Sequence, residues 1–204
     1  MSIAAAQNPL ITAEEYLEGE KLAAVKHEYV DGQVYAMAGA SERHNLISGD
    51  AYSLLKAHLR GGPCRTFMAD LKVQVKTEET ERYYYPDVFV TCEESDSDPY
   101  VKKQPRIVIE VLSPSTWQTD YLIKVTEYRK IPSVEEIVLI AQEWPELILF
   151  RRSDGWQPHA YTQLGSVIRF ESVDFEAPLS AFYESSPFPP DVLRPWYLEQ
   201  RADG

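Results

Sequence analysis

Two carboxylates lie in segments that have the character of buried strands, and here the sequence could support chemistry. Asp87 belongs to Tyr83–Val90 and Glu110 to Ile107–Leu112, two short apolar runs rich in β-branched or aromatic residues. A charge removed from water must be paired or must bind a metal. Two acids on neighbouring strands, with a lysine nearby, suit a site for a hard divalent cation.

A helix is expected directly after the second of these strands. The sequence SPST follows and breaks the strand, and apolar and aromatic residues then recur at helical spacing. Asp120, Lys124 and Tyr128 are separated by four residues each, so they lie along one stripe of that helix. The helix could present Lys124 to the two acids, with Asp120 and Tyr128 as supporting residues.

The order of these motifs, PD, then EVLSPST, then DYLIKVTEY, resembles that of the Uma2 family of restriction-endonuclease-like proteins, a branch of the PD-(D/E)xK nuclease superfamily. The resemblance extends from about Thr12 to about Phe182. It implies an α/β fold with a restriction-endonuclease-like core, in which helices flank a central mixed β-sheet. Superfamily members bind the catalytic metal with two acids, and a lysine two residues after the second acid orients or activates water.

Asp87 and Glu110 match the two acids, but Leu112 occupies the position of the usual lysine. The resemblance therefore makes Lys124 the candidate for a lysine that has migrated to the following helix. It implies metal-assisted hydrolysis of nucleic-acid phosphodiester bonds, with Mg²⁺ or Mn²⁺ held by Asp87, Glu110 and the carbonyl of Val111. It also implies DNA as the substrate and a homodimer as the assembly.

Two residues nearer the N-terminus match the family pattern. Glu28 corresponds to an acid that many superfamily nucleases place near the metal, often through water, although an exposed strand residue is an equal alternative. His44 corresponds to a recurrent Uma2 histidine and lies near the start of a predicted helix, where the helix dipole disfavours a charged imidazole. A capping or surface histidine is the alternative there.

The principal candidates also have structural alternatives. Asp87 could simply end a strand or pair with an arginine. Lys124 could be a solvated helix lysine paired with Asp120. Glu110 is the hardest of the three to explain without a cation, because strands disfavour glutamate.

The charge balance opposes the nuclease reading. The chain has a formal net charge of −12, with 32 acidic and 20 basic residues, whereas phosphate contacts come from lysine and arginine. A nuclease fold that has become an inactive binding module is therefore a second hypothesis, which the missing lysine at Leu112 also supports. A metal-dependent hydrolase of small phosphate esters is a third and has no motif of its own.

Length and composition favour one domain in the cytoplasm. With 204 residues, the chain can bury a substantial core. No run approaches the roughly 20 apolar residues of a membrane span, and no secretory signal is recognisable. The two cysteines, Cys64 and Cys92, have no metal-ligand spacing and are expected to be free thiols in a reducing compartment.

The remaining elements follow from local patterns. We expect a helix from Thr12 to about Ala24, a hairpin around Asp31 and Gly32, and a helix from about Ser41 to Leu59. Three strands between about residues 134 and 161 form an added β-meander. Residues 1–184 are expected to form the domain and residues 185–204 a proline-rich tail, which either folds back onto the domain or docks on a partner subunit.

Overall fold

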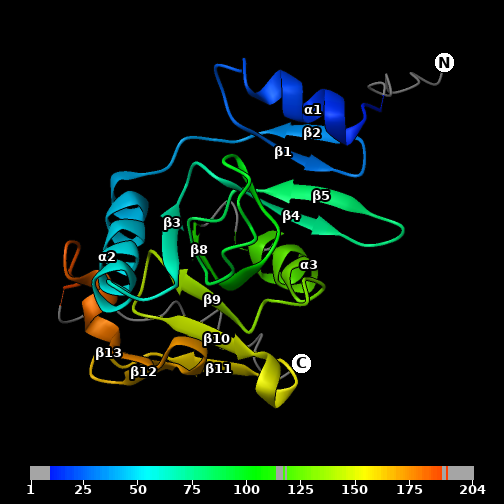
Figure 1. Ribbon diagram of the computed structural model, residues 1–204. Coiled ribbons are helices and arrows are strands. Elements are labelled where there is room, and N and C mark those ends of the chain that lie inside the picture. Colours follow the sequence, from blue (N-terminus) through cyan, green and yellow to red (C-terminus); the bar gives the residue numbers. More distant parts are fainter. Residues whose placement is uncertain (1–9, 114–116, 118, 190–191, 193–204) are drawn as a thin grey trace.

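The protein has a mixed α/β fold that contains three β-sheets (Figure 1). The computed structural model describes residues 10–113, 117, 119–189 and 192, except for the side chains of residues 119 and 120. A five-stranded sheet has the order β2-β1-β5-β4-β7. Its strands are β1 (His27–Val30), β2 (Gln33–Ala36), β4 (Lys72–Lys76), β5 (Glu81–Tyr84) and β7 (Val101–Lys102).

A six-stranded sheet with the order β11-β10-β9-β8-β6-β3 forms the centre of the molecule. The central pair β8 and β9 is parallel, and the other neighbours are antiparallel. The strands are β3 (Arg65–Met68), β6 (Val88–Thr91), β8 (Pro105–Leu112), β9 (Glu136–Ala141), β10 (Leu147–Arg151) and β11 (Pro158–Tyr161). The predicted meander therefore exists, as the consecutive antiparallel strands β9, β10 and β11.

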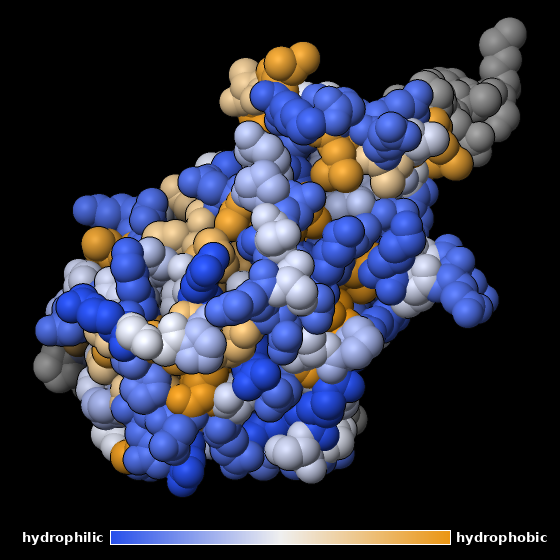
Figure 2. Space-filling model, viewed as in Figure 1, coloured by the Kyte–Doolittle hydropathy of each residue, from blue (hydrophilic) through white to orange (hydrophobic). Residues whose placement is uncertain are grey.

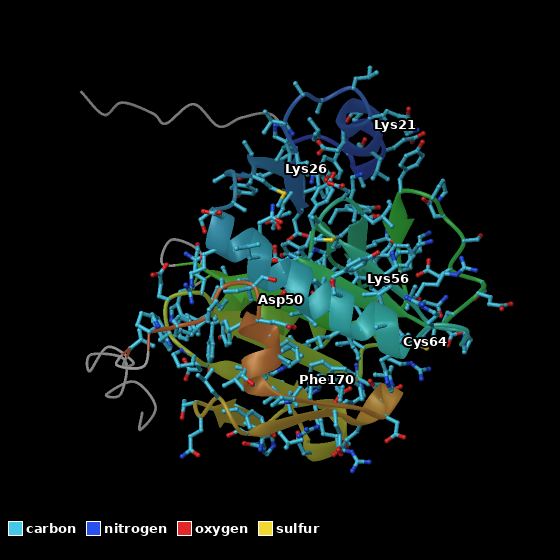
Figure 3. The ribbon with its side chains drawn as sticks, turned by 90° about the vertical axis from the view of Figure 1, so that its left-hand side faces the viewer. Lys21, Lys26, Asp50, Lys56, Cys64 and Phe170 are labelled. Atoms are coloured by element: carbon cyan, nitrogen blue, oxygen red, sulfur yellow. A yellow bond between two sulfur atoms is a disulfide. The ribbon has the colours of Figure 1, made fainter. Side chains whose placement is uncertain are left out.

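Helices cover the six-stranded sheet on both faces (Figure 1). Helix α2 (Glu42–His58) packs on one face, and the π-helix η1 (Thr119–Lys124) with the helix α3 (Val125–Tyr128) packs on the other. Figure 3 shows α2, with Asp50 and Lys56 labelled, crossing in front of the sheet. The smaller elements are α1 (Ala13–Glu20), β12 (Val167–Phe170), β13 (Phe175–Pro178) and the 3₁₀ turns η2 (Arg152–Asp154), η3 (Glu171–Val173) and η4 (Leu179–Tyr183).

Local sequence signals explain where several elements begin. Thr12 and Glu15 form the predicted capping box of α1, with the Thr12 amide 2.7 Å from Glu15 Oε2 and the Glu15 amide 3.2 Å from Thr12 Oγ1. The β1–β2 hairpin turns at Asp31 and Gly32, which both have positive φ, as a two-residue turn of this hand requires. Ser41 caps α2 by accepting a hydrogen bond from the amide of His44.

The side chains of β8 point alternately to the two faces of the sheet, and each face packs against a different part of the core. Ile107, Ile109 and Val111 point toward α2 and belong to one buried cluster. Val108 and Leu112 belong to the other cluster, together with Val125 and Tyr128 of α3. Glu110 has the parity of Val108 and Leu112, so this buried acid faces the side on which α3 packs.

The prediction that Tyr83–Val90 forms one strand is wrong. The chain leaves the five-stranded sheet after Tyr84 and enters the six-stranded sheet at Val88, and three residues lie between. Pro86 belongs to this crossing, and because proline has no amide hydrogen it cannot continue a central ladder. The crossing places Asp87 at the junction of the two sheets.

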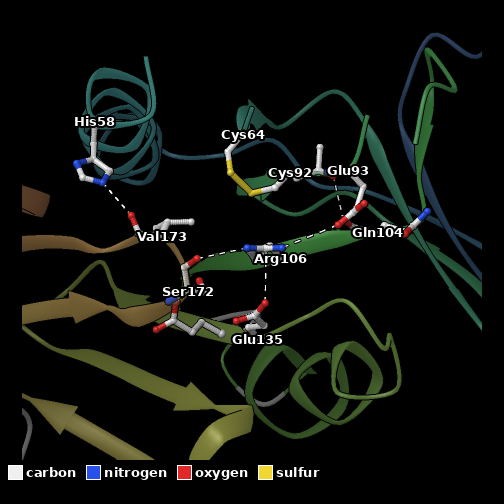
Figure 4. The surroundings of a disulfide bond; sticks show 11 residues. His58, Cys64, Cys92, Glu93, Gln104, Arg106, Glu135, Ser172 and Val173 are labelled. Atoms are coloured by element: carbon white, nitrogen blue, oxygen red, sulfur yellow. Dashed lines mark hydrogen bonds and ion pairs between the residues drawn. A yellow bond between two sulfur atoms is a disulfide. The ribbon is translucent and has the colours of Figure 1, made fainter. Parts of the chain in front are cut away.

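The prediction of two free thiols is also wrong. Cys64 and Cys92 form a disulfide with a Cα–Cα separation of 3.9 Å (Figure 4). They immediately flank Arg65 and Thr91, which are paired between β3 and β6. The prediction rested on the compartment, whereas the pairing follows from a strand register that only the folded chain reveals.

Reducing this disulfide is expected to destabilise the protein by about 3.5 kcal/mol, because the bond closes a loop with a sequence separation of 28 residues. The measurement is urea unfolding with and without a thiol reductant. The Cys64→Ser/Cys92→Ser double variant serves as a control whose stability should not respond to the reductant. Equal stability of oxidised and reduced wild type would contradict the prediction.

The first residues of the predicted tail fold back onto the domain. The Ser185 amide donates to Asp50 Oδ2 at 2.8 Å, and Arg43 Nη2 donates to the Ser186 carbonyl at 2.8 Å. The ring of Phe188 lies 4.9 Å from that of Tyr183. The apolar residues later in the tail, Trp196, Tyr197 and Leu198, lie outside the described residues, and the boundary after residue 184 stays a prediction.

The face of the molecule in Figure 2 is mainly hydrophilic, with apolar side chains scattered over it. Within the part of the chain that the structure describes, no helix has the length and apolar character to cross a lipid bilayer.

Candidate active site

Strand pairing brings the two predicted acids together. β6 runs antiparallel to β8 with Val88 opposite Ile109, so the next pair outward is Asp87 and Glu110. Side chains at opposed positions of neighbouring strands have Cβ atoms about 5 Å apart. The amide of Val111 donates to Asp87 Oδ2 at 2.6 Å, which fixes this carboxylate beside the end of β8.

Glu110 is buried and hydrogen-bonded from α3. Only 3% of the residue is exposed, and the Tyr128 hydroxyl donates to Glu110 Oε1 at 2.7 Å. Burial, with the negative charges of Glu110 and Glu28, raises the pKa of the Tyr128 hydroxyl well above its ordinary value. Tyr128 therefore remains a protonated donor to Glu110, and its supporting role stays a prediction.

Lys124 forms ion pairs with a glutamate of each of the two larger sheets. Its Nζ lies 2.8 Å from Oε1 of Glu28 on β1 and 3.5 Å from Oε1 of Glu110 on β8. The residue is 7% exposed, which rules out the alternative of a solvated surface lysine. Glu28 is likewise no free surface acid, since it faces Lys124 across the space between the sheets.

Lys124 is the last residue of a π-helix. The expected α-helix is a π-helix over Thr119–Lys124, and the α-helical turn begins only at Val125. Short π-helical segments occur frequently at functional sites. The α-helical spacing of four residues still holds between Lys124 and Tyr128, and both side chains reach Glu110.

His44 approaches the site from the N-terminus of α2. Its Nε2 lies 2.8 Å from Asp87 Oδ1, and its amide is held by the Ser41 hydroxyl at 3.1 Å. The two oxygens of Asp87 are thus held from opposite directions, by His44 and by the Val111 amide. This contact favours a site residue over the capping or surface alternative.

Asp120, which the sequence singled out, lies outside the described side chains, because only its place in the π-helix is described. Sequence reasoning missed Tyr84 as a residue that contacts the site. The Lys124 Nζ lies 5.6 Å from the centre of the Tyr84 ring. Burial raises the pKa of Tyr84 to about 12, so the ring stays neutral. Three tyrosines follow one another at 83–85, and only strand parity distinguishes the one that faces Lys124.

Comparison with known proteins agrees with this geometry. The sequence model of the Uma2 family, described as "Putative restriction endonuclease", matches residues 13–180. The chain belongs to the Uma2 family. Two uncharacterized proteins of Synechocystis sp. are similar to it: slr1290 is 39% identical over 148 residues, covering 72% of this chain and 76% of the relative. The protein sll1609 is 34% identical over 140 residues, covering 67% of this chain and 78% of the relative.

The fold of this Uma2 protein is that of a solved structure, described as a "putative nuclease belonging to DUF820" from Anabaena variabilis. The two structures align with a TM-score of 0.68, covering 85% of this chain and 98% of the other. Their sequences are 16% identical, so the likeness shows the shared fold. The restriction-endonuclease-like fold predicted from the sequence is confirmed.

The donor atoms at this Uma2 site fit a hard cation. Since N–H and C=O of one residue in a strand point to the same edge, the Val111 carbonyl faces the edge at which its amide binds Asp87. Among the described residues, no group of three or more His, Cys, Asp or Glu side chains is placed to hold a metal. Two carboxylates, one carbonyl and water nevertheless suit Mg²⁺, which usually keeps several waters.

The charge balance at the site also favours a cation. Two carboxylates, those of Glu28 and Glu110, pair with one ammonium group, that of Lys124, and the carboxylate of Asp87 is held beside the end of β8. Both Glu110 and Lys124 are nearly inaccessible to solvent, where interactions between charges are stronger than in water. Such an excess of buried negative charge is reduced when a divalent cation binds.

Proposed function

We propose that this Uma2 protein is a Mg²⁺-dependent endonuclease that hydrolyses phosphodiester bonds of DNA. The observation that supports this most directly is the position of Lys124, buried between Glu110 and Glu28 and beside the Asp87–Glu110 pair. Leu112 occupies the usual lysine position, and Lys124 supplies an ammonium group at the same carboxylate from the following helix. The Anabaena protein described as a "putative nuclease" has the same fold.

Asp87, Glu110 and the Val111 carbonyl would hold the cation. When bound, a divalent cation polarises a phosphate group and lowers the pKa of a coordinated water. Lys124 would orient the attacking water or stabilise the negative charge that develops on the phosphate. His44 and Tyr128 would position Asp87 and Glu110 through the hydrogen bonds described above.

Further parts of this proposal concern the partners of the chain. We propose a homodimer, as the family resemblance led us to expect, and a cytoplasmic location, which was expected because no membrane span or secretory signal is recognisable in the sequence. The net charge of −12 makes nucleic-acid binding depend on offsetting the acidic groups at the site, which the bound cation would do together with Lys124. Cleavage is therefore expected to weaken as the salt concentration rises.

The test of the proposal combines metal binding with cleavage of plasmid DNA. Wild type is expected to bind Mg²⁺ or Mn²⁺ in isothermal titration and to nick plasmid, whereas Asp87→Asn loses most of the metal affinity and the nicking together. Asn can still accept the hydrogen bond from the Val111 amide, so the fold is retained. If wild type binds neither metal and leaves DNA intact at high protein concentration, the proposal fails and the inactive binding module takes its place.

A further inference from the structure

A second concave site lies on the other side of the helix that carries Lys124. It is an open pocket of about 290 Å³ between η1–α3 and the β10–β11 hairpin. Its walls include the aromatic side chains of Tyr121, Phe150 and Trp156, with Arg129 among them. None of the residues proposed for metal binding or catalysis lines this pocket.

Arg129 brings a positive charge that is not neutralised by the described part of the chain. Its guanidinium lies 5.1 Å from the ring centre of Phe150 and 5.7 Å from that of Trp156. Its Nη2 donates to the Trp156 carbonyl at 3.2 Å, but its buried Nε has no hydrogen-bond partner among the described residues. A buried donor without a partner is rare in folded proteins and indicates that a ligand or water completes the site.

A second arginine reinforces this charge. The guanidinium of Arg152 lies 4.9 Å from the ring centre of Trp156. Its donors bind backbone carbonyls, those of Arg129, Ile131 and Val134, rather than any carboxylate that the structure describes. Two guanidinium groups therefore lie near the Trp156 ring, that of Arg129 in the pocket lining and that of Arg152 outside it, and their positive charge favours an anion in this pocket.

Trp156 itself is held in an uncommon backbone conformation. Its φ is +67°, a left-handed value that bulky residues rarely adopt. The adjoining turn fixes it, since the Trp156 amide donates to the Arg151 carbonyl at 2.8 Å. Strained residues of this kind cluster at ligand sites, where the surrounding structure keeps them in place.

We propose that this pocket binds a nucleoside monophosphate group, with the base against the aromatic rings and the phosphate on Arg129. Aromatic faces and guanidinium planes stack on bases of any sequence, and arginine donors match the geometry of phosphate oxygens. A volume of about 290 Å³ lies at the lower end of the range for small-ligand sites, which favours a single nucleotide over a longer strand. The group could come from a free nucleotide or from the phosphorylated end of a strand.

The experiment is isothermal titration of adenosine 5′-monophosphate into the whole protein in EDTA, which keeps metal binding out of the measurement. Wild type is expected to bind, and Arg129→Gln to bind at least tenfold more weakly. Leu122→Glu, which adds a negative charge at the exposed rim of the pocket, is expected to weaken binding to a similar extent. Leu122 is 64% exposed, so this second variant tests the pocket without disturbing the core.

Ile123→Glu is the matched control. It adds the same charge at the next residue of the same helix, where the side chain is exposed and does not line the pocket, so nucleotide affinity should be unchanged. A parallel titration with a 5′-phosphorylated oligonucleotide distinguishes a free nucleotide from a strand end as the natural ligand. If Leu122→Glu weakens binding of the oligonucleotide but adenosine 5′-monophosphate does not bind, the pocket is assigned to strand ends. Failure of wild type to bind either ligand at millimolar concentration, or binding that ignores Leu122→Glu, would overturn the proposal.

Discussion

The Glu110→Gln variant is expected to lose DNA cleavage by a factor on the order of 1,000, the scale on which single electrostatic groups contribute to catalysis. Glutamine keeps the shape of the side chain and can still accept the hydrogen bond that Tyr128 donates at 2.7 Å. It removes the negative charge that a hard cation requires. The fold should therefore survive while both metal affinity and cleavage fall.

A matched control is available in Glu127, a second buried acid. Glu127 is 5% exposed and pairs with Arg82 at 2.9 Å and with Lys130 at 2.7 Å. Glu127→Gln makes the same chemical change and should leave cleavage within a few-fold of wild type. Initial rates of plasmid nicking at saturating Mg²⁺ compare the two variants. Cleavage by Glu110→Gln within tenfold of wild type would exclude Glu110 from the mechanism.

The Lys124→Met variant is expected to lose both activity and stability. Methionine fills much of the same space but leaves Glu28 and Glu110 without the ammonium group that lies 2.8 Å and 3.5 Å from them. Removing one partner of a buried ion pair costs about 3–5 kcal/mol, because the remaining charge is uncompensated. Cleavage is expected to fall by roughly 100- to 1,000-fold, since the group that orients water or stabilises the phosphate charge is gone.

Two measurements separate this effect from general damage to the fold. Urea unfolding of Lys124→Met should show a stability loss that shrinks when Mg²⁺ is added, because the cation replaces the missing positive charge. Lys130→Met serves as the control: Lys130 also pairs with a glutamate, but it is exposed, so its loss should cost less than about 1 kcal/mol. A destabilisation of Lys124→Met that Mg²⁺ does not relieve would contradict a shared metal and lysine site.

The features of the site that the sequence predicted correctly depend on local periodicity. The strand character of Ile107–Leu112 identified Glu110 as a buried acid, and the four-residue spacing of Lys124 and Tyr128 placed both on one helix face. Both inferences need only the parity of a strand or the turn of a helix. The strand character of both segments suggested that Asp87 and Glu110 lie on neighbouring strands, and the family resemblance then supplied their expected role as metal ligands.

The features that the sequence did not predict depend on contacts between distant segments. The split of Tyr83–Val90 between two sheets follows from which strands β5 and β6 pair with, and the disulfide follows from the register of β3 against β6. The pocket at Trp156 likewise joins residues from η1–α3 and from β10–β11. Apolar periodicity indicated strands and a helix in these regions, but it did not show where one strand ends and the next begins, or how the elements lie relative to one another.

The π-helix between the site and the pocket bears on how this family can diverge. A π-helical turn contains more residues than an α-helical turn, so deleting Ile123, between Leu122 and Lys124, would let the segment become α-helical. The residues before the deletion would rotate by about 100° relative to Lys124. Tyr121 and Leu122 would turn away from the pocket while the lysine stayed in place. Insertions and deletions of single residues in the π-helix could thus change the pocket during evolution and leave Lys124 in place. Family members could then differ at the pocket through the length of this helix as well as through its residues.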